Sequence, residues 1–229
     1  MRTRQLVFIL ALMVFGGGYV SAKQYIDNLP SNSETSFYDS KAKALQVLKT
    51  VYQRYDALSS LTMDIDVTIM DGDYAYKKTG STIVKGDKFK LDTEDEKIVS
   101  DGQSMWVYLK SDKSLQITDA TEDNQNFFCY PTKLLQKYQS SCAVELIGQA
   151  NGNYTVQFNA YNDDCPYETI KVSINKNYQI TKISVLEAED MGYTISINNI
   201  KKNVSLSDST FKFNTASVDK SKTRDLRTK

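Results

Sequence analysis

Three groups of residues in this sequence could support chemistry by their type and spacing. They are a pair of aspartates on one strand, two clusters of acidic residues and three cysteines. Asp64 and Asp66 stand two residues apart in an alternating segment, so they share one strand face, as metal-binding or catalytic carboxylates can. The alternative is a solvated strand face, because the residues that alternate with them are apolar. The acidic groups at 163–164 and 187–190 fit loop or strand-end charges in the same way.

The sequence lacks the residues and motifs that most classes of enzyme use for catalysis. The chain contains no histidine, which is the commonest general base and the commonest neutral metal ligand. It also contains no Gly-x-Ser-x-Gly elbow, glycine-rich phosphate loop or Cys-x-x-Cys pair. We therefore expect a non-enzyme with no catalytic residues, no metal and no cofactor. The residue types alone do not exclude a pair of catalytic carboxylates of the kind that glycosidases use.

The three cysteines are Cys129, Cys142 and Cys165. In an oxidising compartment, one bonded pair and one leftover thiol is a reasonable arrangement. A bond between Cys129 and Cys142 would close a short loop around a predicted helix. Three unpaired, partly buried cysteines are the alternative, and the sequence leaves both open.

The N-terminal segment has the three parts of a cleavable export signal at residues 1–22. Arg2 and Arg4 precede an apolar run at 6–15 and small residues at 20–22. The apolar run is shorter than the about 20 residues that a membrane span needs. Cleavage there would leave Lys23 rather than a cysteine at the new N-terminus, so we expect a soluble periplasmic protein without a lipid anchor at that end.

Charge and length limit the partners and the number of domains. The formal net charge is zero, and it becomes −2 without Arg2 and Arg4 because residues 1–22 contain no acidic residue. Such a balance gives no electrostatic attraction to nucleic acid. The length suits one domain with a sizeable core.

The hydrophobic pattern predicts one helix followed by many strands. Residues 23–38 are polar and predict a flexible leader, whereas apolar residues at helical spacing predict a helix at 40–59. From Leu61 the apolar residues alternate, which predicts a strand. Further strands are predicted at about 74–85, 88–93, 97–100, 104–110, 114–118, 142–149, 153–160, 168–174, 179–188, 191–200 and 210–214.

Turn signals complete the layout. Pro131 predicts the start of a short helix over 132–138, and Asn151-Gly152 predicts a hairpin turn. The charged tail at 216–229 predicts disorder. The fold class is therefore mainly β: a single domain with about eleven antiparallel strands, forming a curved sheet or open barrel whose concave face two or three short helices cover.

Two neighbouring segments carry a family resemblance. The first contains Gly86-Asp-Lys-Phe89, and the second reads Val99-Ser-Asp-Gly-Gln-Ser-Met-Trp-Val-Tyr108 around an Asp-Gly turn. As an ordered pair, with Phe211-Lys-Phe213 near the end, they resemble the LolA family of periplasmic carriers, which move lipoproteins between the two membranes of Gram-negative bacteria. The resemblance implies an unclosed half-barrel domain over 39–215.

The resemblance also implies an apolar cavity between the sheet and the helices that receives acyl chains. The residues expected to line it are Leu45, Leu48, Tyr52, Leu61, Met63, Ile65, Val67, Ile69, Phe89 and Leu91. Ordinary core packing is the alternative for each of them. Trp106 alternates away from Met105 and Val107, so we expect its side chain on the other side of the sheet.

The chain departs from the family where LolA-like proteins carry an arginine before a proline. That arginine hydrogen-bonds to the lid helices, whereas Lys85 or Gly86 stands here. Lys85 is the candidate latch, a less specific one because it lacks arginine's planar fork, and a solvated strand-end lysine is the alternative.

The implied partners are acylated lipoproteins, an inner-membrane lipoprotein-releasing ABC transporter and an outer-membrane acceptor, with the carrier acting as a monomer. A lipid-binding or lipoprotein-sensing module on the same fold is the alternative function, and a carrier of another amphiphilic product is a further one.

Overall fold

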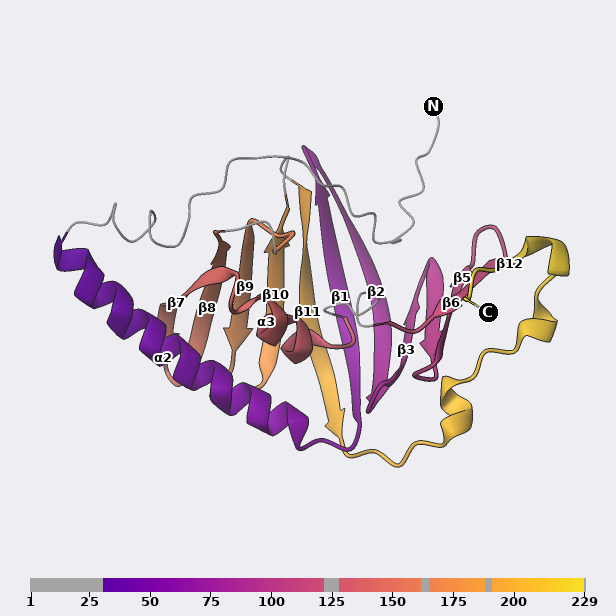
Figure 1. Cartoon of the computed structure of the whole chain (residues 1–229), viewed down its shortest axis with the longest axis horizontal. Helices are drawn as coiled ribbons and strands as arrows, with labels where there is room; N and C mark the ends of the chain where they lie inside the picture. Colours follow the sequence, from indigo (N-terminus) through magenta and orange to yellow (C-terminus); the bar gives the residue numbers. More distant parts are fainter. Residues whose placement is uncertain (1–30, 122–127, 162–164, 188–190, 229) are drawn as a thin grey trace.

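One curved sheet organises the chain. The computed structural model describes residues 31–121, 128–161, 165–187 and 191–228. Within them twelve strands follow the order β12-β6-β5-β4-β3-β2-β1-β11-β10-β9-β8-β7. Neighbouring strands run antiparallel, except that β12 lies parallel to β6. The sheet does not close on itself, since β7 and β12 form its two edges (Figure 1). The predicted mainly-β, unclosed single domain is confirmed.

Along the chain, one group of helices and strands precedes α3 and a second group follows it. The first half comprises α2 (Ser31–Asp56), β1 (Leu61–Asp71), β2 (Tyr74–Lys85), β3 (Lys88–Thr93), β4 (Glu96–Ser100), β5 (Ser104–Leu109) and β6 (Ser114–Asp119). Then come α3 (Pro131–Tyr138), β7 (Cys142–Ala150), β8 (Asn153–Ala160), β9 (Thr169–Ile174), β10 (Ile180–Leu186) and β11 (Met191–Lys202). The chain ends with the short 3-10 helices η2 (Asp208–Phe211), η3 (Thr215–Ser217) and η4 (Lys220–Lys222), and with β12 (Thr223–Asp225).

Local turn chemistry sets the hairpins. In the turn between β4 and β5, Gly102 has a φ of +89°, and the Asp101 carboxylate accepts hydrogen bonds from the amides of Gln103 and Ser104 at 2.9 and 2.8 Å. The turn between β7 and β8 places Asn151 and Gly152 at φ of +52° and +77°, as a two-residue hairpin turn requires. The predicted hairpin there is confirmed.

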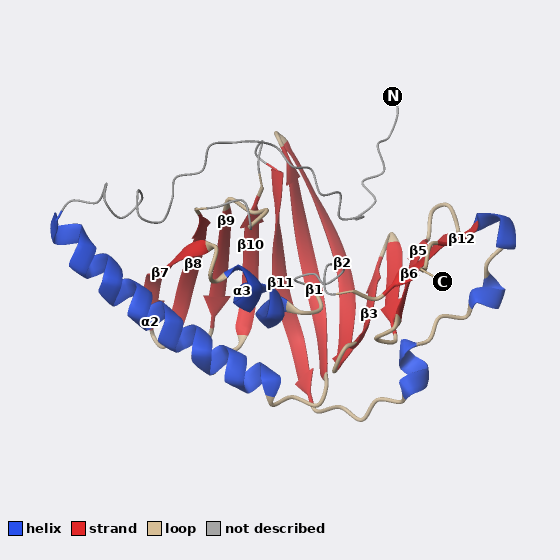
Figure 2. Ribbon diagram, in the orientation of Figure 1, coloured by secondary structure: helices blue, strands red, loops and turns tan. Residues whose placement is uncertain are grey.

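The two α-helices lie on the concave side of the sheet. Figure 1 shows α2 crossing in front of the β7 to β11 half, with α3 between it and the centre of the sheet; Figure 2 shows the same layers by element type. Buried apolar residues from α2, α3 and the alternating strands join in one cluster between these layers. The core therefore sits under the helices.

The N-terminal boundary differs from the prediction. The helix begins at Ser31 and ends at Asp56, so residues 31–38 of the predicted flexible leader are helical. Extending an existing helix costs far less than nucleating one, so a polar segment can follow the apolar face beyond it. The predicted signal peptide, and the leader up to residue 30, lie outside the described residues.

The C-terminal segment also corrects two predictions. Residues 210–214 are not a strand, because Ser207 caps the 3-10 helix η2 by accepting a hydrogen bond from the amide of Ser209. Within the described part of the predicted disordered tail, residues 216–228, β12 pairs with β6 and the amide of Leu226 donates to the Ile117 carbonyl at 2.8 Å. The exposed edge of β6 offers backbone partners that a charge pattern cannot reveal.

A second, smaller cluster lies on the convex face. Leu115, Ile117 and Val218 are buried together, with Trp106, Tyr108 and Phe213 packed against them. Met105 and Val107, the neighbours of Trp106, pack against the main cluster instead. The predicted outward direction of Trp106 is confirmed, and the C-terminal segment covers it.

None of the helices among the described residues is long and apolar enough to cross a membrane.

Candidate functional site

The predicted cavity residues come together on the concave face. The side chains of Leu61, Met63, Ile65, Val67 and Ile69 point to one side of β1 and are at most 8% exposed, while the residues between them are exposed or half-buried. Phe89 and Leu91 continue this surface on β3 with 4% and 2% exposure. All belong to the one cluster under the helices, so the structure supplies a continuous apolar surface, packed shut by side chains.

Helix α2 contributes the predicted residues of the cover. Leu48 is fully buried, Tyr52 is 9% exposed and Leu45 is half-buried, and all three pack in or against the same cluster. The Tyr52 hydroxyl donates to the Gln139 side chain, just after α3, at 3.2 Å. Burial raises the pKa of Tyr52, so its hydroxyl stays protonated and can donate at any physiological pH.

Polar contacts of α2 fall where two strands are irregular. The β7 register shifts between Leu146 and Gly148, and the Ser40 hydroxyl accepts from the Leu146 amide at 2.9 Å and donates to its carbonyl at 3.1 Å. The β10 register shifts next to Ile180, whose amide donates to the Tyr55 hydroxyl at 3.2 Å. Burial raises the pKa of Tyr55 to about 12. These side chains satisfy backbone groups at the edge strand β7 and at the start of β10.

Helix α3 and the residues before it form the second part of the cover. Pro131 starts the helix, as predicted, and Leu134, Leu135 and Tyr138 are buried. Phe128 and Tyr130 precede the helix and are buried as well. Among these apolar residues, the sequence predicted burial only for Leu134 and Leu135, from their positions in the short helix. The aromatic residues outside it had none, because their burial depends on the distant strands that they meet.

The segment that leads into α3, and Lys133 of α3, contact the opposite half of the sheet from α2. Thr82 on β2 is fully buried, with its hydroxyl 3.3 Å from the Cys129 sulfur, and Phe89 packs edge-on against Tyr130 with ring centroids 5.6 Å apart. At the rim, Lys133 forms an ion pair of 2.9 Å with Asp87, which follows Gly86 in the turn between β2 and β3. At its other end, α3 lies on the half that carries α2, since Tyr138 packs edge-on against Tyr167, ahead of β9, with ring centroids 5.5 Å apart.

Lys85, the candidate latch, reaches the C-terminal segment. Its ammonium donates to the Leu206 carbonyl at 2.9 Å and to Asp208 at 3.1 Å, and Lys88 pairs with the other Asp208 oxygen at 3.2 Å. These two lysines hold the pKa of Asp208 below its usual range. The charged contact from this turn to a helix of the cover is made by Asp87, two residues further on.

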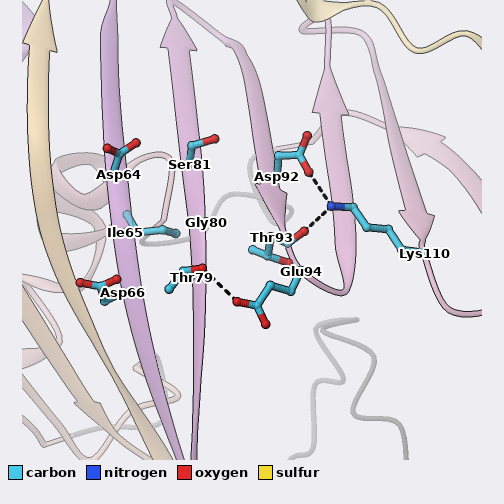
Figure 3. A pocket seen from close by; sticks show the side chains of 10 residues that line it. All are labelled: Asp64, Ile65, Asp66, Thr79, Gly80, Ser81, Asp92, Thr93, Glu94 and Lys110. Carbon is cyan, nitrogen blue, oxygen red and sulfur yellow. Dashed lines mark hydrogen bonds and ion pairs between the residues drawn. The ribbon is translucent and has the colours of Figure 1, made fainter.

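The Asp64 and Asp66 carboxylates lie on the convex face. They accept hydrogen bonds from Asn199 and Asn198, each at 2.8 Å. They line a shallow pocket of about 480 Å³ over Gly80, with Glu94 and Lys110 on its other side (Figure 3). Within the described part of the chain, no group of three or more histidine, cysteine or acidic residues could hold a metal ion.

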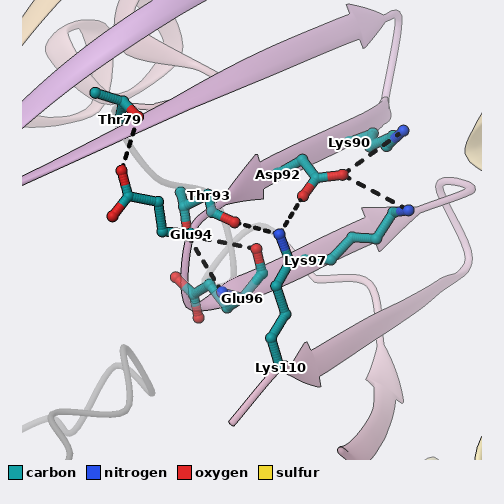
Figure 4. A network of polar contacts seen from close by, with 8 residues as sticks. All are labelled: Thr79, Lys90, Asp92, Thr93, Glu94, Glu96, Lys97 and Lys110. Atoms are coloured by element: carbon teal, nitrogen blue, oxygen red, sulfur yellow. Dashed lines mark hydrogen bonds and ion pairs between the residues drawn. The ribbon is translucent and has the colours of Figure 1, made fainter.

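Beside that pocket the charges are matched within the sheet. Asp92 pairs with Lys110 at 2.7 Å, Lys97 at 3.6 Å and Lys90 at 4.0 Å (Figure 4). Partial burial by itself would raise the pKa of Asp92, but Lys110 and the other two lysines hold it below its ordinary value. Thr79 donates to Glu94 at 3.0 Å. This surface is a hydrated strand face whose carboxylates have partners.

Of the two alternatives that the sequence leaves open for the cysteines, the structure has three unpaired thiols and no bond between Cys129 and Cys142. All three are free thiols and are buried. Cys129 contacts Thr82 on β2, whereas Cys142 begins β7 at the far edge of the sheet. Five strands separate β2 from β7 in the sheet order, each spaced about 4.8 Å from the next. Cys129 and Cys142 are close in sequence but lie apart in the fold, because the chain crosses the sheet between them.

The amino-acid sequence is similar to a known protein family and to an archaeal protein. A family model described as "Outer membrane lipoprotein carrier protein LolA" matches residues 69–214. An uncharacterized protein of Methanocaldococcus jannaschii is 24% identical over 181 residues, which cover 73% of this chain. The match covers 50% of that protein, so the chain spans about half the length of this relative.

Several solved structures are similar to this chain at low sequence identity. A putative outer membrane lipoprotein-sorting protein domain from Vibrio parahaemolyticus is 10% identical, covering 75% of this chain and 97% of that one, with a TM-score of 0.41. A LolA superfamily protein from Nitrosomonas europaea is 10% identical, covering 74% and 97%, with a TM-score of 0.40. A DUF1329 family protein from Desulfovibrio piger is 12% identical, covering 79% and 99%, with a TM-score of 0.44.

Proposed function

Because the chain belongs to the LolA family, we propose that it is an extracytoplasmic carrier that shields the acyl chains of lipoproteins. The acyl chains would lie between the helical cover and the concave face of the sheet, in contact with the stripe on β1. In the fuller form of the proposal, the protein receives lipoproteins from an inner-membrane ABC transporter and delivers them to an outer-membrane acceptor.

The physical need for a carrier is the cost of exposing acyl chains to water. Each methylene group moved from lipid into water costs about 0.8 kcal/mol. Three long chains would therefore cost some tens of kcal/mol, by roughly that rate, if they crossed an aqueous compartment without cover. Apolar contacts are not directional, so acyl chains can replace the contacts between helices and sheet and can later be released.

The observation that carries the proposal is the way the cover is attached. The inner faces of α2 and α3 contact the sheet through apolar side chains such as Leu48 and Leu135, both fully buried. Their polar contacts include those of Ser40 and Tyr55, which hold α2 to β7 and β10, and that of Lys133, which holds α3 to the turn between β2 and β3. One side-chain hydrogen bond also joins Tyr52 of α2 to Gln139, just after α3. A cover held by apolar contacts and such side-chain bonds can move away from the stripe on β1 without breaking the ladder of the sheet.

The proposed location rests on the sequence signal at residues 1–22, which lie outside the described residues, and on the family. Export would be tested by sequencing the N-terminus of the protein recovered from the periplasm of a Gram-negative host. We expect a mature N-terminus at Lys23. An uncleaved protein retained in the cytoplasm would contradict the proposed location.

Binding is tested with a triacylated lipopeptide that displaces a fluorescent fatty-acid analogue. We compare Ile65→Glu on the stripe with Thr68→Glu, which adds the same charge to the outer face of the same strand. We expect the first change to abolish binding and the second to leave it intact. Because Ile65→Glu could prevent folding, Ile69→Trp provides an uncharged obstruction at a stripe residue that is 8% exposed.

A folded Ile69→Trp protein should bind the lipopeptide at least tenfold more weakly than the wild type. Equal binding by the wild type and both stripe variants would contradict the proposal. Binding of free phospholipid but not of lipopeptide would favour the lipid-binding alternative on the same fold.

A further inference from the structure

One buried hydroxyl on the concave side has no hydrogen-bond partner within the described part of the chain. Tyr130 precedes α3 and is only 5% exposed, yet its hydroxyl oxygen is buried without a partner there. Buried polar side chains are normally paired, because an unpaired group has lost its contacts with water and gained none in return. The Tyr130 hydroxyl is therefore available to a ligand that carries a hydrogen-bond acceptor.

The Tyr130 ring lies between the buried cluster and the rim of the sheet. It packs edge-on against Phe89, with ring centroids 5.6 Å apart, and both residues belong to the main cluster. The Lys133 ammonium lies 4.7 Å from the centroid of the same ring. Lys133 pairs with Asp87 at the rim, where their side chains are 43% and 80% exposed. A ligand whose apolar part contacts Phe89 and whose polar part reaches the rim would therefore pass Tyr130.

The charges near Tyr130 favour a neutral acceptor. Burial raises the pKa of Tyr130, and the nearby Cys129 and Asp87 raise it further, so the hydroxyl stays protonated and acts as a donor. The Lys133 ammonium is already paired with Asp87 at 2.9 Å. A carboxylate or phosphate here would lose its hydration and meet the negative charge of Asp87. An ester carbonyl carries no charge, so it avoids both costs.

A second hydroxyl on the same half of the sheet is buried without a partner. It is the side-chain oxygen of Thr118 on β6, again judged within the described residues. The register places one row of directly opposed residues across β3 to β6: Phe89, Ser100, Met105 and Thr118. Opposed residues share a face of the sheet, and Phe89 and Met105 pack in or against the main cluster. Both hydroxyls therefore lie on the concave side, in the half that contains β3 to β6.

We propose that the Tyr130 hydroxyl donates a hydrogen bond to a glyceryl ester carbonyl of the lipoprotein cargo, at the point where an acyl chain joins its glyceryl group. This inference rests on the proposed carrier function. The acyl chains lie against the buried cluster, and the glyceryl group faces the rim beside Tyr130. Because the hydroxyl gains its partner only in the bound state, the site favours ester-linked chains over ether-linked chains, which have no carbonyl.

The test compares a lipopeptide that has two ester-linked acyl chains with its ether-linked counterpart, each displacing the fluorescent fatty-acid analogue. We expect the wild type to bind the ester form about tenfold more tightly than the ether form. Tyr130→Phe should bind both forms with the affinity that the wild type has for the ether form. Equal affinity of the wild type for the two lipopeptides, or an unchanged ester preference in Tyr130→Phe, would overturn the proposal.

Tyr52→Phe is the matched control, because the Tyr52 hydroxyl already donates to Gln139 at 3.2 Å. This variant should keep the ester preference. Stability separates the two hydroxyls further: Tyr130→Phe should unfold at the wild-type urea concentration or above it, because it removes an unpaired hydroxyl, whereas Tyr52→Phe should unfold at a lower concentration. A clear loss of stability in Tyr130→Phe would mean that its hydroxyl is already bonded in the free protein, which would overturn the proposal.

Phospholipids contain the same glyceryl esters, so ester-linked and ether-linked phosphatidylethanolamine form a second arm of the test. A Tyr130-dependent ester preference for the lipopeptide supports the proposal. A preference confined to the phospholipid would overturn it, because the contact would then belong to free lipid. Tight binding of both lipopeptides without an ester preference overturns this inference and leaves the carrier proposal standing, whereas failure of the wild type to bind either lipopeptide overturns both.

Discussion

The two faces of the sheet are both covered, but they are covered in different ways. On the concave face, α2 and α3 lie over the strands through apolar side chains, with side-chain hydrogen bonds and one ion pair at the ends. On the convex face, the C-terminal segment joins the sheet through its backbone, because β12 pairs with β6 and Leu226 donates to Ile117. The contrast suggests a removable cover on one side and a permanent one on the other.

Lys85 and Asp87, two residues apart in the chain, each contact a different one of these two covers. Lys85 binds the C-terminal segment through Leu206 and Asp208, while Asp87 pairs with Lys133 on α3. The turn between β2 and β3 therefore touches both covers. Loss of the Asp87 contact removes the ion pair between α3 and this turn and leaves the contacts of Lys85 with the C-terminal segment intact.

The largest loss of stability is expected for a substitution in the C-terminal segment, the permanent cover of the convex face. Phe211 in η2 is fully buried, so Phe211→Ala should lower the free energy of unfolding by about 3–5 kcal/mol, measured by urea denaturation. The lipopeptide affinity of the folded fraction should stay within twofold of the wild type. A loss of affinity that parallels the loss of stability would show that the two faces do not act independently.

A smaller loss is expected on the removable cover. Leu48→Ala on α2 removes a fully buried side chain, but a helix attached mainly by apolar contacts can settle into the gap, so we expect a loss of about 2 kcal/mol. A saturating lipopeptide should restore stability, by about 2.7 kcal/mol at a concentration 100 times its dissociation constant. Denaturation with and without lipopeptide provides the measurement. Absence of any stabilisation by the lipopeptide would contradict the account.

The attachment of the permanent cover should depend on pH through Asp208. The pKa of Asp208 is lowered in the folded protein by Lys85 and Lys88, so its contribution is present above the ordinary aspartate pKa and is lost as pH falls through the folded value. Asp208→Asn should therefore be slightly less stable than the wild type at pH 7 and equally stable in strong acid. Urea midpoints across this pH range test the prediction, and a difference that persists in acid would contradict it.

The smallest effect is expected for the ion pair that joins α3 to the sheet. Asp87 and Lys133 are exposed, so Asp87→Lys should change stability by at most about 1 kcal/mol while the lipopeptide association rate rises. The doubly exchanged protein, with Asp87→Lys and Lys133→Asp, should return the rate to the wild-type value. Stopped-flow binding of the three proteins measures this, and equal rates for all of them would mean that the pair is no latch.

Much of the sheet could be predicted from the sequence because its strands alternate. The stripe from Leu61 to Ile69 has period two in both sequence and burial, and the Asp101-Gly102 and Asn151-Gly152 turns form where their residue types require. The same alternation pointed to the residues that lie on the concave face. What it could not show is whether that face opens, since core residues and cavity residues have the same pattern.

The features that the sequence did not predict depend on contacts between distant segments. The pairing of β12 with β6 joins residues 223–225 to 115–117, and nothing in the short polar stretch Thr223-Arg-Asp225 indicates a strand. The partners of Lys85 lie at Leu206 and Asp208, which no local pattern connects to it.

The most direct test of the central claim is to locate a bound acyl chain. A triacylated lipopeptide with a diazirine in the middle of one acyl chain is bound, photolysed and mapped by mass spectrometry of the cross-linked peptides. The account predicts adducts on the concave residues, such as Met63, Leu91 and Leu135, which lie in the main cluster. Adducts on Trp106 or Val218, in the smaller convex cluster, would contradict it.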